Sequence, residues 1–78
     1  MASTAWQDVE ELLHELEKGQ QRRLLELARR LKPGLTHEDI GCAQDFPELR
    51  DADWQYEDGV LAGIRSALAA VRARHRRE

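Results

Sequence analysis

The spacing of the large apolar residues constrains this chain most, because in two long segments they recur at three or four positions or at the two-turn spacings of seven or eight. In the first segment they are Trp6, Val9, Leu13, Leu16, Leu24, Leu27 and Leu31. In the second they are Trp54, Leu61, Ile64, Leu68 and Val71. This spacing lines side chains along one face of an α-helix. No segment alternates as a strand would, and good helix formers dominate the composition, so an all-α fold is predicted.

The first helix is predicted over residues 5 to 32, after a capping box at residues 4 to 7 that starts with Thr4. Pro33 and Gly34 end it. Gly19 costs on the order of 1 kcal/mol inside a helix. No capping residue follows it and the apolar spacing keeps its phase, so one helix is expected, with a bend near Gly19 as the open alternative.

A polar connector is predicted over residues 33 to 52, with one or two short helical turns. Thr36 has the position of an N-cap before a turn that ends at Gly41. Asp45 is expected to cap a second turn in which Pro47 stands early, where its missing N–H does no harm.

The last helix is predicted over residues 53 to 76, beginning near Asp51 or Asp53. Beside its large apolar residues runs a face of small ones: Gly59, Gly63, Ala67 and Ala70. Gly59 and Gly63 are one turn apart, so another helix can approach closely there. Flanking charges favour packing in water over the membrane use of this spacing.

The charges are segregated into four blocks that match when the two helices lie antiparallel. Residues 1 to 17 are acidic, 18 to 33 basic, 34 to 58 acidic and 59 to 78 basic. Opposite charges on neighbouring helices select their orientation. The prediction is an antiparallel helical hairpin.

With 78 residues the chain is expected to form one small domain whose core is marginal without additional support. A single cysteine, Cys42, excludes an internal disulfide. The apolar stripes are wider than one neighbour covers, which favours a homodimer forming a four-helix bundle. The alternative is a monomer whose connector completes the core through Ile40, Phe46 and Leu49.

Residues 1 to 11 lack the basic start and apolar run of a signal peptide, and no stretch approaches the roughly 18 apolar residues of a membrane span. These observations predict a cytoplasmic protein with no membrane partner.

No catalytic constellation and no cofactor loop is visible, so an enzyme is not expected. Glu11 and His14 form the E-x-x-H spacing of metal-binding helical bundles, but the motif needs a second copy and occurs by chance in Glu-rich helices. Cys42 follows His37 by five residues without an orienting third group, so a buried structural thiol is expected.

The arginines between Arg72 and Arg77 offer nucleic-acid binding as an alternative function, although the net charge of −3 opposes it. Residues 23 to 40 resemble a helix-turn-helix only faintly, because Glu38 and Asp39 would lead the recognition helix toward phosphates.

Aromatic side chains stand among acids between residues 45 and 58, a mixture suited to a basic, partly apolar partner. Tyr56 lies off the apolar stripe, whereas Trp54 lies on it and is favoured as core. The candidate contact residues are Tyr56, Phe46, Trp54, Gly59 and Gly63. The expected function is a non-catalytic interaction or regulatory module acting through helix faces, with nucleic-acid binding and a metal-binding bundle as alternatives.

Overall fold

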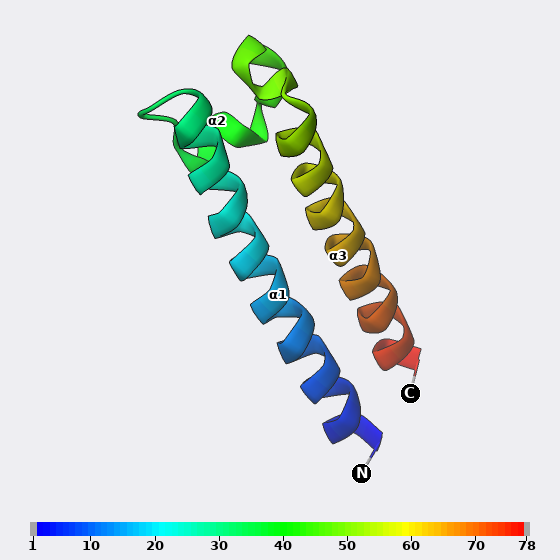
Figure 1. The fold of residues 1–78 in the computed structure, drawn as a ribbon. Helices are drawn as coiled ribbons and strands as arrows, with labels where there is room; N and C mark the ends of the chain where they lie inside the picture. The colour runs from blue at the N-terminus through cyan, green and yellow to red at the C-terminus, as the bar shows by residue number, and fades with distance from the viewer. Residues whose placement is uncertain (1, 78) are drawn as a thin grey trace.

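Two long helices packed side by side make up most of the molecule in the computed structural model, which describes the backbone of residues 2 to 77 and the side chains of residues 5 to 77. Helix α1 spans Ala2–Leu31 and α3 spans Ala52–Arg77. They run antiparallel, so both chain ends lie at one end, called here the open end (Figure 1). The predicted all-α hairpin is confirmed.

Helix α1 is continuous through Gly19, as predicted. Its predicted start was wrong, because the backbone is already helical from Ala2, two residues before Thr4. Nothing in the Ala-Ser-Thr run breaks a helix, and the capping contact expected of Thr4 lies outside the described side chains. The helix ends where Gly34 adopts a φ of +92°, a left-handed conformation that glycine reaches without strain.

The connector contains the short helix α2, His37–Gly41, and two 3-10 turns, η1 at Ala43–Asp45 and η2 at Pro47–Arg50. Thr36 caps α2 as predicted: its hydroxyl accepts the Asp39 N–H at 3.3 Å, and the Asp39 carboxylate accepts the Thr36 N–H at 2.9 Å. The reciprocal bonds satisfy two otherwise free donors.

Of the two other caps predicted from the sequence, one is absent and one is present. Asp45 does not cap η2, because it ends η1 and the carbonyl of Phe46 instead accepts the Leu49 N–H at 3.0 Å. Asp51 does cap α3, since its carboxylate accepts the Trp54 N–H at 3.0 Å.

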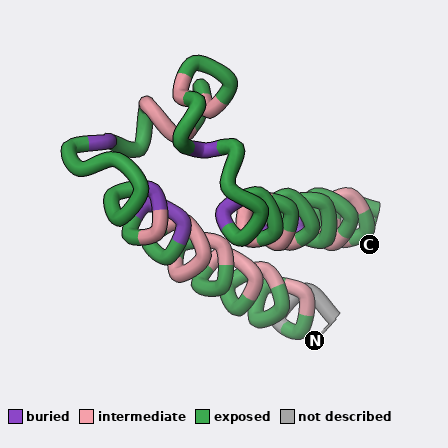
Figure 2. Tube along the Cα trace, turned by 45° about the horizontal axis from the view of Figure 1, so that its top comes forward, coloured by how far each residue is buried: buried purple, intermediate pink, exposed green. Residues whose placement is uncertain are grey.

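The core gathers where the connector crosses the two helices, as the buried segments in Figure 2 show. Its buried cluster consists of Leu24, Ala28, Leu35, Leu49, Trp54 and Leu61. The indole N–H of Trp54 donates to the carbonyl oxygen of Leu24 at 3.1 Å, so the largest core side chain is satisfied as well as buried.

Toward the open end the contact between α1 and α3 is mixed: Leu68 is 3% exposed, and polar pairs lie beside it. Glu17 Oε2 accepts from Arg65 Nε at 2.9 Å, and Glu10 Oε1 lies 2.7 Å from His75 Nδ1. These contacts confirm the antiparallel pairing of charge blocks.

Candidate interaction face

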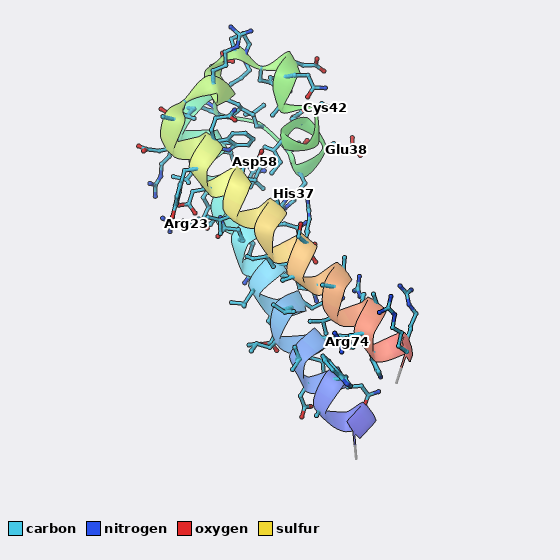
Figure 3. The ribbon with its side chains drawn as sticks, turned by 90° about the vertical axis from the view of Figure 1, so that its right-hand side faces the viewer. Arg23, His37, Glu38, Cys42, Asp58 and Arg74 are labelled. Carbon is cyan, nitrogen blue, oxygen red and sulfur yellow. The ribbon has the colours of Figure 1, made fainter. Side chains whose placement is uncertain are left out.

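The two helices form one layer, and the connector covers only one side of it. Figure 3 shows His37, Glu38 and Cys42 on one side of this layer and Arg23 on the other. We call the side that carries Arg23 the uncovered face. An α-helix has 3.6 residues per turn, so residues three, four or seven positions from Arg23 lie on the same side of α1 as Arg23.

Helix α1 supplies large apolar side chains to the uncovered face. Val9, Leu12 and Leu16 are 40, 57 and 49% exposed. Leu16 lies two turns before Arg23, and the other two lie within two turns of Leu16 on the same side. They turn away from α3 because Glu10 and Glu17 occupy the positions that face it. The apolar stripe predicted for α1 is therefore only partly covered.

Helix α3 supplies smaller side chains to the same face. Val60, Ile64 and Val71 are half-buried, whereas Gly63, Ala67 and Ala70 are exposed. Side chains added at Gly59 or Gly63 would meet nothing within 4 Å, so the close approach expected at these glycines is not made between α1 and α3. The uncovered face thus has a large-residue side on α1 and a small-residue side on α3.

A hydrogen-bonded cluster closes the contact between the helices below this face. The Gln20 amide donates to the backbone oxygen of Glu57 at 2.8 Å and to its carboxylate at 2.9 Å. Arg23 Nε donates to the same carboxylate at 3.0 Å. The bond from Gln20, together with Arg23, lowers the pKa of Glu57 below its ordinary value, while partial burial acts in the opposite direction.

The lowered pKa predicts a stability that depends on pH. The Glu57 interactions contribute fully above the pKa of the unfolded carboxyl and are lost as the pH falls through the lower folded pKa. Thermal melts of wild type and Glu57→Gln should differ most at neutral pH and converge in acid. A difference that stays constant from pH 7 to pH 3 would contradict this assignment.

The candidate contact residues separate into three groups. Trp54 is 1% exposed and belongs to the core cluster with Leu24 and Leu61, the role that its place on the apolar stripe favoured over that of a contact residue. Phe46 is half-buried against the same core. Tyr56 is 70% exposed and lies one turn before Val60, at the border of the uncovered face.

The candidate metal ligands Glu11 and His14 lie in the first half of α1. The ring of His14 lies 3.5 Å from Glu17 and contacts the guanidinium of Arg72, a cation that opposes a metal ion there. Among the side chains that the structure describes, no group of three or more His, Cys, Asp or Glu residues is placed to hold a metal. Cys42, expected to be buried, is exposed in the turn between α2 and η1.

On the covered side, the connector and both helices enclose a cleft of about 520 Å³. Leu24 and Leu61 contribute apolar lining, and Gln21, His37, Asp58 and Arg65 add polar groups. The sequence analysis did not find it, because its lining residues come from four elements that only the fold brings together.

The arginine-rich end of α3 lies beside the acidic start of α1, as the Glu10–His75 contact shows. We therefore expect no useful affinity for duplex DNA at physiological salt, since nearby carboxylates offset the arginines. Gel shifts at several salt concentrations measure this. Submicromolar binding with a steep salt dependence would instead support the nucleic-acid alternative.

No family model, curated protein sequence or solved structure matches this chain. Within residues 2 to 77, neither long helix contains an apolar window suited to crossing a membrane.

Proposed function

We propose that this chain is a non-catalytic interaction module that works through helix-face contacts and pairs with a second copy as a four-helix bundle. The observation that carries the proposal is the exposure of Val9, Leu12 and Leu16 beside one another on the uncovered face. Covering such a surface stabilises a small domain considerably, because its own core buries little apolar area.

The position of the core supports the same proposal. The buried cluster lies at the connector end, while the open half of the hairpin buries only Leu68 and is otherwise joined by polar contacts such as Glu17–Arg65. Exposed ion pairs contribute roughly 0–1 kcal/mol each. A second hairpin laid on the uncovered face adds apolar burial to the half that has least of it. Two-fold pairing is the commonest way in which identical chains do so.

The test replaces Leu16, which is 49% exposed, by glutamate. Sedimentation equilibrium of the wild type at micromolar concentration should give a dimer mass. Leu16→Glu should raise the dissociation constant at least about a hundredfold, since the dimer loses two buried leucines at about 1.5 kcal/mol or more each. Both residues are good helix formers, so the hairpin itself should persist.

Gln7→Glu is the matched control, because it adds the same charge to an exposed position of α1 on another side of the helix. It should leave the dissociation constant unchanged. A monomeric wild type with a cooperative thermal transition would overturn the dimer and show that the connector alone completes the core.

A further inference from the structure

We infer that the second copy docks on the uncovered face with the two-fold axis parallel to the helices, so that α1 of each copy lies along α3 of the other and both connectors lie at one end. This inference rests on the proposed dimer and adds its arrangement. The other two-fold arrangement, with the axis across the helices, places α1 on α1 and α3 on α3 with the connectors at opposite ends.

Residue sizes favour the lengthwise axis. Contacts within the chain show which residues stand level on the two helices: Glu17 is level with Arg65, and Glu10 with His75. The Gln20 contact with the backbone oxygen of Glu57 gives a third such pair. Leu16 therefore stands near the level of Gly63 and within about one turn of Ala67. A lengthwise two-fold keeps this level, so Leu16 of one copy faces the small residues Gly63 and Ala67 of the other.

The crosswise axis matches sizes poorly. It brings the exposed leucines of the two α1 helices against each other and leaves the small faces of the two α3 helices opposite one another. One half of the interface would then be crowded and the other half empty. Protein interiors are packed densely, so an arrangement that sets large residues against small ones in both halves is favoured.

Charges at the connector end agree with the lengthwise axis. Arg30 lies two turns after Arg23 on α1, and Asp53 lies two turns before Val60 on α3, so both lie near the connector end. Both are exposed, and neither forms an ion pair within the described part of the chain. The lengthwise axis sets each Arg30 near the other copy's Asp53, whereas the crosswise axis separates them by the length of the bundle.

Tyr56 completes this end of the interface. Its side chain is 70% exposed, and it precedes Glu57, which bonds Gln20 and Arg23, so it stands near the level of Arg23 on α1. In the lengthwise arrangement its ring lies beside the guanidinium of Arg23 of the second copy, a cation that suits the face of a tyrosine ring. The contact candidate found in the sequence thereby acquires a defined partner.

Distances between nitroxide labels distinguish the two arrangements. One label is placed on native Cys42, which is exposed near the connector end, and the other at the open end in the Cys42→Ser, Ala5→Cys variant. The lengthwise axis predicts that both intermolecular distances fall well below the 47 Å length of the hairpin. Open-end labels separated by about that length would overturn the arrangement while leaving the dimer intact.

Ala67→Leu gives a second test, because it should weaken the dimer in one arrangement and strengthen it in the other. With the lengthwise axis the added side chain collides with Leu16 of the other copy, so the dissociation constant should rise at least about tenfold. With the crosswise axis it fills empty space and tightens the dimer. Ala62→Leu, at an exposed position of α3 that points away from this face, should change nothing. A monomeric wild type would overturn the proposed dimer itself. That result is distinct from a failure of the lengthwise arrangement, which would show in the label distances or in the effect of Ala67→Leu on a dimer that still forms.

Discussion

Trp54→Ala should destabilise the fold by about 3–5 kcal/mol, the largest loss expected from any single truncation here. The side chain is 1% exposed at the centre of the core, and its indole N–H is bonded to Leu24 O at 3.1 Å. Truncation removes the ring's apolar contacts, leaves a cavity and removes the hydrogen bond to Leu24. Chemical denaturation followed by circular dichroism, at one fixed protein concentration, measures the loss.

Two variants make this prediction specific. Trp54→Phe keeps much of the apolar volume and loses the hydrogen bond, so a smaller loss is expected. Trp6→Ala removes the same side chain from a half-buried site near the open end, where no core cluster surrounds it. Equal losses for Trp6→Ala and Trp54→Ala would show that the core is not concentrated at the connector end.

Leu49→Ala should cost about 2–5 kcal/mol, the second-largest expected effect. Leu49 is 1% exposed and belongs to η2, so it is the residue by which the last part of the connector enters the core. Its loss opens a cavity beside Trp54 and loosens the turns that cover one side of the layer. The same denaturation experiment measures it, and increased hydrogen exchange of residues 42 to 51 should accompany the loss.

Leu31→Ala is the matched control, because Leu31 is 38% exposed at the end of α1 and its truncation removes less buried apolar surface. Leu49→Met, which roughly conserves volume, should cost less than about 1.5 kcal/mol. Equal stability of Leu49→Ala and Leu31→Ala would show that Leu49 does not anchor the connector to the core.

Local patterns were enough to predict the helices, the Thr36 cap and the direction of the chain. Each depends on neighbours in sequence or on blocks of charge. A three-and-four spacing marks a helix wherever it lies, Thr36 and Asp39 cap each other within one turn, and acidic and basic blocks match in one orientation only. The Thr4 start and the Asp45 cap failed because the helix extends farther toward the N-terminus and η1 uses Asp45 as its last residue.

Only the tertiary structure decided which part of each stripe is buried. The spacing assigned Val9 and Leu16 to the same stripe as Leu24, yet Leu24 is 1% exposed and the other two are 40 and 49% exposed. A helix presents a broad apolar face to a neighbour that covers only part of it. The packing of Trp54 on Leu24 and the contact of Glu17 with Arg65 set the rotation of α1, and that rotation leaves one apolar side of the hairpin open.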